Sequence, residues 1–197
     1  MTQPCTLYAL FLLLMTTGPA RGEEQNREDD IVQFWNTSEL IWTTSTTSMK
    51  AQLCKVDLKV DISQNNITFY RALIKSREWH VRKYNGTFRD YYKKYDSVKI
   101  QSTDRRDKAR EVLQYRSKDS TCAVIWVVTS NEYRLTPSYD LRIKDSYIKK
   151  HTPNNSECWQ QFLNVTRGRK YRRMYHRGCH AVFYKRVMSS TSMKGHE

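Results

Sequence analysis

The sequence lacks a stretch of apolar residues long enough to cross a bilayer, which takes about 20 residues. Its longest apolar run, 8–15, is short and is followed by small residues over 16–22. This pattern is typical of a secretory signal peptide. We therefore expect residues 1–22 to be cleaved off, and residues 23–197 to form a single domain that is secreted and has no membrane anchor.

Catalytic and metal-binding signatures are also missing. The sequence contains no nucleophile elbow, zinc-protease motif, P-loop or dinucleotide fingerprint, and its cysteines show no CxxC or Cys–His spacing. The five histidines are scattered, which is typical of surface histidines. We expect no enzyme activity, no metal and no cofactor. A haem carrier is the minor alternative, because His80 or His180 could lie on the inner wall of a barrel.

Acidic residues are in the minority. The chain has 20 Asp and Glu against 34 Lys and Arg, which gives a formal net charge of +14 at pH 7. Such an excess attracts anions and opposes self-association, so we expect a monomer. The most basic segment, 167–177, is either a solvated connection or a site for a heparin-like polysaccharide or a host protein. Nucleic acid is not an expected partner of an exported protein.

Two counts agree with export. Four cysteines remain after residue 22, an even number typical of disulfide-bonded secreted proteins, and they allow three pairings. The chain also carries more N-glycosylation sequences than chance would place. The cysteines are Cys54, Cys122, Cys158 and Cys179, and the acceptor asparagines are Asn36, Asn66, Asn85, Asn154 and Asn164.

Short strands dominate the expected secondary structure. Residues 54–62 alternate between apolar and charged, which predicts a strand with one face in water, and 67–74 runs back. Asn85-Gly86 predicts a hairpin turn between strands 79–84 and 87–92. Further strands are expected at 96–100, 109–115, 122–128, 138–143 and 180–184, helices at 29–42 and 157–166, and a connector at 43–48. This number of strands favours a sandwich or barrel.

Four sequence blocks together carry a family resemblance. The first is a helical stretch with Trp35 and Trp42 that precedes a strand opening at Cys54. The second is the segment 112–115 together with 122–127. The third is the motif 139–142, and the fourth is the segment 158–162, which is followed by Cys179. In this order they resemble the tick salivary lipocalins of the histamine-binding type. The resemblance implies an all-β fold, an eight-stranded antiparallel lipocalin barrel with a short N-terminal helix and one C-terminal helix packed outside. It also implies the disulfides Cys54–Cys179 and Cys122–Cys158.

The resemblance further implies capture of a small host mediator in the barrel, which suppresses host defence at the feeding site. Histamine and serotonin are the ligands expected from the family. This chain differs where amine-binding members carry acids, because Ala123 and Trp159 stand there and only Asp140 keeps a carboxylate. An ammonium group buried in a barrel needs a partner charge. The residues therefore favour a lipid mediator, such as an eicosanoid or a fatty acid.

Strand parity indicates which side chains face the ligand. Position 123 is where amine-binding members carry their first acid. If its side chain points inward, 123, 125 and 127 line the lumen and Trp126 faces outward. By the same parity, Asp140 and Arg142 share an inward face. Those two either pair with each other, or Arg142 binds a ligand carboxylate. The candidate ligand-binding residues are Asp140, Arg142, Ala123, Ile125, Val127, Trp42 and Glu78.

Overall fold

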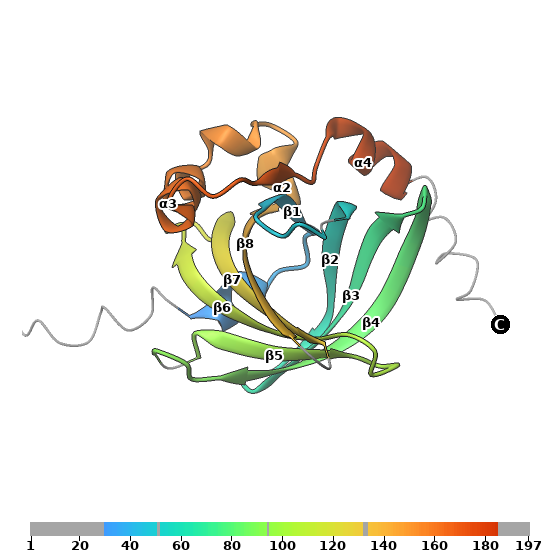
Figure 1. The fold of residues 1–197 in the computed structure, drawn as a ribbon, viewed down its shortest axis with the longest axis vertical. Coiled ribbons are helices and arrows are strands. Elements are labelled where there is room, and N and C mark those ends of the chain that lie inside the picture. Colours follow the sequence, from blue (N-terminus) through green and yellow to red (C-terminus); the bar gives the residue numbers. More distant parts are fainter. Residues whose placement is uncertain (1–29, 51, 94, 132–133, 185–197) are drawn as a thin grey trace, which may run out of the picture.

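A computed structural model describes residues 30–50, 52–93, 95–131 and 134–184, so the expected signal peptide lies outside the described residues. Its strands are β1 Ile41–Thr46, β2 Leu53–Ile62, β3 Asn66–Lys75, β4 Glu78–Arg89, β5 Ser97–Ser102, β6 Lys108–Arg116, β7 Cys122–Asn131, β8 Arg134–Lys144 and β9 Arg172–Arg173. Each of β2 to β7 pairs antiparallel with the next strand along the chain, and β1 pairs with both β8 and β2. This closes an eight-stranded barrel (Figure 1), to which the two-residue β9 is added. The predicted fold class is confirmed.

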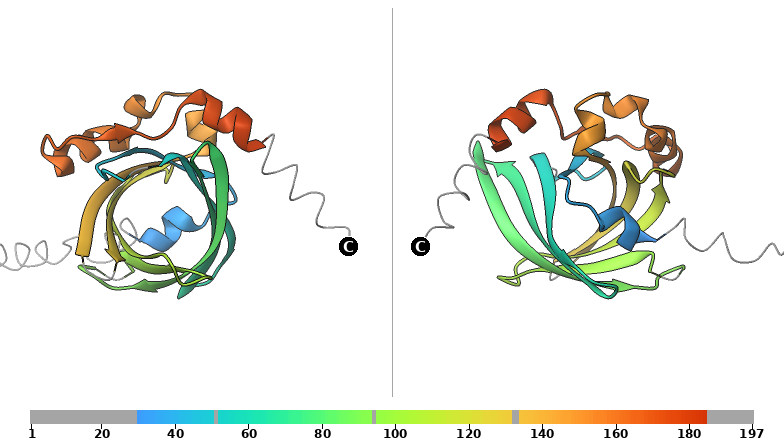
Figure 2. Two further views of the ribbon diagram at one scale, coloured as in Figure 1. Left: turned by 45° about the vertical axis from the view of Figure 1, so that its right-hand side comes forward. Right: turned by 180° about the vertical axis from the view of Figure 1, so that it is seen from behind.

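The helices are distributed over both sides of the barrel wall. They are α1 Ile31–Trp35, α2 Asp145–Ile148, α3 Glu157–Thr166 and α4 Arg177–Phe183, with a 3-10 turn at Pro153–Asn155. The last three helices lie outside, whereas α1 lies within the outline of the barrel (Figure 2). Apolar side chains are therefore buried on both faces of the barrel wall. An inner cluster includes Phe34 and Trp35, and an outer cluster lies under the late helices. No helix in the described part of the chain is long and apolar enough to span a membrane.

Both disulfides join the outer helices to strands. Cys54–Cys179 connects β2 to α4 with 5.2 Å between the Cα atoms, and Cys122–Cys158 connects β7 to α3 with 6.0 Å. The expected pairing is confirmed. On the chain-entropy account, loops of 125 and 36 residues stabilise the fold by about 3–5 kcal/mol each. The ring of His176 lies beside the first disulfide, but oxidised cysteines offer no thiolate to a metal ion.

The expected hairpin at Asn85-Gly86 is wrong, because β4 runs straight through this dipeptide. Gly86 faces the lumen between Ile67 and Val98, and a Cβ atom there would come within 2.7 and 2.8 Å of their methyl groups. Glycine is needed at this position because the neighbouring strands pack closely against its backbone, and not because the chain turns.

The expected last strand, 180–184, is also wrong. Most of it belongs to α4, where Phe183 packs against the rings of Trp42 and Trp79 on the outside of the barrel. A closed barrel offers no free edge along which a further long strand could pair. An apolar segment at the end of the chain must therefore bury its side chains by another route, and it does so as a helix.

The elements of the N-terminal region have other boundaries than the sequence predicts. The helix expected over 29–42 is limited to α1, and the expected connector 43–48 forms most of β1. Its Ser and Thr residues are buried where β1 pairs with β8 on one side and, at Ser45 and Thr46, with β9 on the other. The segment forms a strand because neighbouring strands pair with it, since its local sequence shows no alternation of apolar and polar residues.

Candidate functional site

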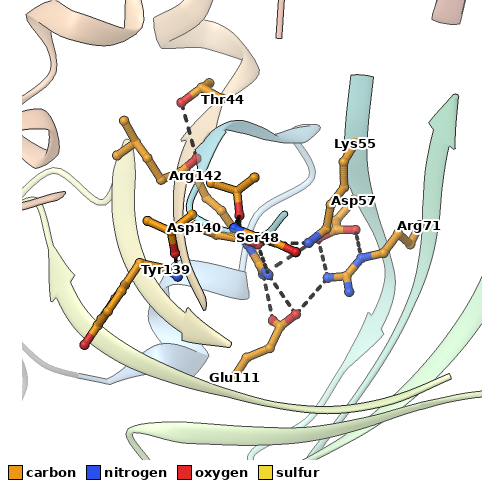
Figure 3. Close-up of polar contacts among 12 residues, drawn as sticks. Thr44, Ser48, Lys55, Asp57, Arg71, Glu111, Tyr139, Asp140 and Arg142 are labelled. Carbon is orange, nitrogen blue, oxygen red and sulfur yellow. Dashed lines mark hydrogen bonds and ion pairs between the residues drawn. The ribbon is translucent and has the colours of Figure 1, made fainter. Parts of the chain in front are cut away.

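The barrel lumen contains a cluster of six charged side chains (Figure 3), called here the lumen network. Inward-facing positions on β2, β3, β6 and β8 bring them together, and their charges balance. All except Lys55 are buried. The members are Lys55, Asp57, Arg71, Glu111, Asp140 and Arg142.

Arg142 lies at the centre of the lumen network. Its Nη1 and Nη2 donate hydrogen bonds of 2.7 Å each to the two carboxylate oxygens of Glu111, a bidentate arrangement. Its contact with Asp140 is longer, at 3.4 Å. Asp140 instead accepts its shorter hydrogen bonds from Thr46, at 2.6 Å, and from Lys55, at 2.9 Å. The two residues do contact each other, but each has a closer partner.

Arg71 connects the two remaining acids. Its Nε and Nη2 donate to the oxygens of Asp57 at 2.6 and 2.8 Å, and Nη2 also donates to Glu111 at 2.9 Å. Among the described residues no hydrogen bond uses its third nitrogen, Nη1 (Figure 3). Arg71 is therefore the one network arginine that both neutralises acids and keeps a terminal donor for another group.

The electrostatic balance keeps Glu111 and Asp140 of the lumen network ionised. Burial alone would raise the pKa of Glu111, but the guanidinium groups of Arg142 and Arg71 outweigh it and hold this pKa well below its usual value. Burial also opposes ionisation of Asp140, whose pKa is nevertheless lowered by Lys55 and Arg142. Burial lowers the pKa of Lys55 itself by more than Asp140 raises it.

Part of the lumen is filled and part is open. The ring of Trp35 packs 4.7 Å from that of Phe69 and 5.7 Å from the Arg142 guanidinium carbon, so α1 closes the lumen over the network. A cavity of about 230 Å³ remains beside Arg71. It is lined by Gln52, Arg71, Leu73, Lys75, His80, Arg82, Tyr84 and Asp107.

Among the described residues, the one acid that lines this cavity is already engaged. Asp107 contacts the guanidinium of Arg82 and accepts a hydrogen bond of 2.9 Å from the Tyr84 hydroxyl. Burial raises the pKa of Tyr84 to about 12, so its hydroxyl stays a donor at neutral pH. Arg71 and Lys75 add two further positive charges to the lining. The cavity therefore offers donors and positive charge to a ligand.

The sequence profile of the tick histamine binding protein family matches residues 23–181. The chain belongs to this family. Among solved structures, a serotonin complex of AM182 has a TM-score of 0.55 at 14% identity, covering 72% of this chain and 85% of that one. Japanin from Rhipicephalus appendiculatus, bound to cholesterol, has a TM-score of 0.44 at 8% identity, covering 66% and 87%. No curated protein matches the chain in sequence.

Membership in this family of binding proteins confirms the prediction that the chain is not an enzyme, and it supports binding of a small molecule. In this family member, strand parity correctly places Ala123, Ile125 and Val127 on the inner wall. Asp140 and Arg142 face inward with them, within the lumen network. A contact of these five residues with ligand stays a prediction.

Two other candidate residues lie away from the lumen cavity. Trp42 points to the outer side of the barrel wall, because successive side chains along a strand face opposite sides. There its Nε1 donates a hydrogen bond of 2.9 Å to Asp145, and its ring packs against α4. Glu78 is exposed at the start of β4 and does not line the cavity. The expectation for Trp42 is corrected, whereas contact of Glu78 with a ligand stays a prediction. His80 does border the cavity, whereas His180 lies outside and contacts Asp145.

Sequence reasoning missed Lys55, Asp57, Arg71 and Glu111. The alternation over 54–62 was the available signal, but its charged residues Lys55 and Asp57 point into the lumen and not into water. The error arises because the late helices cover the apolar face of β2 near Val56, so both faces are buried in that part of the strand. The alternation by itself does not show which face is inside.

Proposed function

We propose that this lipocalin is a secreted protein that captures a compact host mediator in its lumen cavity and does not turn it over. Family membership supports small-molecule capture, as does the barrel shared with a lipocalin solved with serotonin. Export is supported by the two disulfides and by a family match that begins at residue 23. All five acceptor asparagines are exposed, so glycans on them would project into solvent.

The ligand we propose is acidic or neutral rather than an amine. Each lumen carboxylate is already paired with a cation of the chain, so an ammonium group would have to displace Lys55, Arg71 or Arg142. Leaving such a cation buried without its partner is costly. The observation that carries the proposal is the Nη1 donor of Arg71, on the side chain that borders both the network and the cavity.

The cavity also limits ligand size. Its volume of about 230 Å³ lies below the roughly 300–1,000 Å³ that is usual for drug-sized ligands. A single aromatic ring with a short acidic arm suits this space better than a long-chain fatty acid or an eicosanoid. The lipid preference expected from sequence is therefore narrowed, for the lumen, to a compact acid.

Calorimetric titration with matched ligand pairs tests this proposal. Histamine and imidazole-4-acetate share a ring and differ in the charge of the arm, as do serotonin and 5-hydroxyindole-3-acetate. We expect the acids to bind more tightly, and Arg71→Lys to weaken them by about 1.5–3 kcal/mol, the range for hydrogen bonds to charged groups. Arg82→Lys is the control, because Arg82 borders the same cavity but is held by Asp107. Tight histamine binding without an acid signal would refute the proposal.

The basic surface supports a second candidate function. Residues 167–173 are all exposed, and the five arginines and lysines among them leave a positive stripe beside β1. Such a stripe is suited to a heparin-like polysaccharide or an acidic host protein. Retention on a heparin column that persists above about 0.15 M ionic strength would favour this function, whereas elution below it would exclude it.

A further inference from the structure

A second concave site lies on the outer face of the barrel. It has a volume of about 730 Å³, within the range usual for small-molecule sites. Its lining comes from β4 to β8 and from Tyr91 in the segment after β4. Trp126 and Val128 face it, and they alternate along β7 with the lumen residues Ile125 and Val127. This site, called here the outer groove, thus faces away from the lumen network.

Strand register arranges the outer groove into two halves. Thr87 pairs with Lys99, Lys99 with Arg110, Arg110 with Val128, and Val128 with Pro137, which forms one row across five strands. The β5–β6 half of the row is cationic and the β7–β8 half is apolar. A site with this division is suited to a molecule that has one charged end and one apolar end.

The cationic half is electrostatically unbalanced. Lys99 and Arg110 lie directly opposite each other, an arrangement that destabilises neighbouring strands when charges are alike. Lys108 adds a third cation on the same face, two residues from Arg110. No acidic side chain lines the outer groove among the described residues, and no described acid pairs with these three cations. A bound anion would relieve this repulsion.

The apolar half is built from rings and aliphatic groups. The ring of Trp126 lies 5.7 Å from that of Tyr91, and the Arg110 guanidinium carbon lies 5.2 Å from the Tyr91 ring centre. Val128 and Pro137 continue this surface. Arg110 therefore marks the boundary between the two halves, with its charge held over an aromatic ring.

We propose that the outer groove binds a long-chain fatty acid, with its carboxylate over Lys99, Lys108 and Arg110 and its alkyl chain over Trp126, Val128 and Pro137. The separation of charge favours this ligand over a polyanion, which would require cations along its whole length. The inference is independent of the proposed lumen function, because the two sites lie on opposite sides of the wall.

Titration of the protein with cis-parinaric acid, a fluorescent fatty acid, tests the inference. Asn85 lines the outer groove within a glycosylation sequence, so the protein is first treated with glycosidase. We expect Lys99→Gln/Arg110→Gln to weaken binding at least about tenfold, which corresponds to 1.4 kcal/mol. The control Lys83→Gln/Lys118→Gln removes two exposed charges that do not line the groove, and it should bind like the parent protein. Parinaric methyl ester, which lacks the charge, should not distinguish these variants.

Three results would overturn the inference. The first is fatty-acid binding that is unchanged in Lys99→Gln/Arg110→Gln but lost in Arg71→Lys, since this would place the fatty acid in the lumen. The second is no fatty-acid binding together with groove-dependent sedimentation with phosphatidylserine vesicles, which would make the groove a membrane contact. The third is no fatty-acid binding together with groove-dependent retention on heparin. Circular dichroism spectra of the variants check that each retains the fold.

Discussion

Arg142 and Glu111 face each other across the lumen and share two hydrogen bonds of 2.7 Å, while neither side chain is exposed to solvent. The guanidinium thus holds the carboxylate in the way that a cationic ligand would. The lumen of this family member is neutralised by its own residues. Three consequences of this pairing can be measured.

Removing one partner of the pair should destabilise the protein strongly. We expect Arg142→Met or Glu111→Gln alone to lower the free energy of unfolding by about 3–5 kcal/mol, because each leaves a buried group without its partner. The double variant should cost clearly less than the sum. Urea unfolding of the four proteins measures this coupling. Additive losses would show that the two side chains do not stabilise each other.

Removing the internal guanidinium should also create a site for an amine. In Arg142→Ala, the carboxylates of Glu111 and Asp140 lose a cation, and space opens beneath Trp35. We expect this variant to bind histamine more tightly than the parent protein in calorimetric titration. Adding Asp140→Asn should reduce the gain, whereas Arg142→Lys, which keeps the charge, should show no gain. Histamine binding by the parent protein that Asp140→Asn abolishes would mean that the intact network already accepts an amine.

Acid should destabilise the fold through the same carboxylates. The folded-state pKa values of Glu111 and Asp140 are lowered, so their stabilisation is complete above the unfolded values of about 4.3 and 3.9. It is lost as the pH falls below about 5 towards the folded-state values. Unfolding midpoints measured from pH 7 to pH 3 should therefore drop less steeply for Glu111→Gln than for the parent protein. If the midpoints of the two proteins fall in parallel, Glu111 does not cause the loss of stability in acid.

The close packing around Gly86 predicts a further effect. We expect Gly86→Ala to destabilise the protein by about 1–3 kcal/mol, because its methyl group would overlap Ile67 and Val98. Gly168→Ala is the control, since it has open space around it but a φ of +75°. The cost there comes from backbone strain, so Gly168→Asn, which tolerates this conformation better, should recover part of it, and Gly86→Asn should not. Thermal unfolding distinguishes the two causes.

Some elements follow from local sequence and others do not. Helix α3 matches the expected 157–166, because apolar residues at helical spacing lie on one face of it. The inward face of β7 is also predicted correctly, since it follows from strand parity once the family position is fixed. By contrast, β1 and α4 depend on closure of the barrel, which gives the Ser/Thr-rich segment two partners and denies an edge to the last apolar one.

The residues of the candidate site likewise fall into those that the local sequence identifies and those that it does not. Asp140 and Arg142 could be identified because they lie in a recognisable block, and their shared face follows from their spacing of two residues. Glu111 and Arg71 come from strands 40 residues apart in sequence, and only closure brings them within 2.9 Å. The balance of charge in the lumen is a property of the whole barrel, so no single segment reveals it.

The disulfide between Cys54 and Cys179 has a consequence for the chain after proteolytic cleavage. The exposed arginines and lysines of 167–173 lie between Cys158 and Cys179, and they are the residues after which trypsin-like enzymes cut. A cut there would separate the chain into two pieces, yet α4 would stay bonded to β2, and α3 to β7. Strands β1 to β8 all lie before such a cut, so the nicked molecule would keep its whole barrel with α4 still attached, and it would fall into two fragments only under reducing conditions.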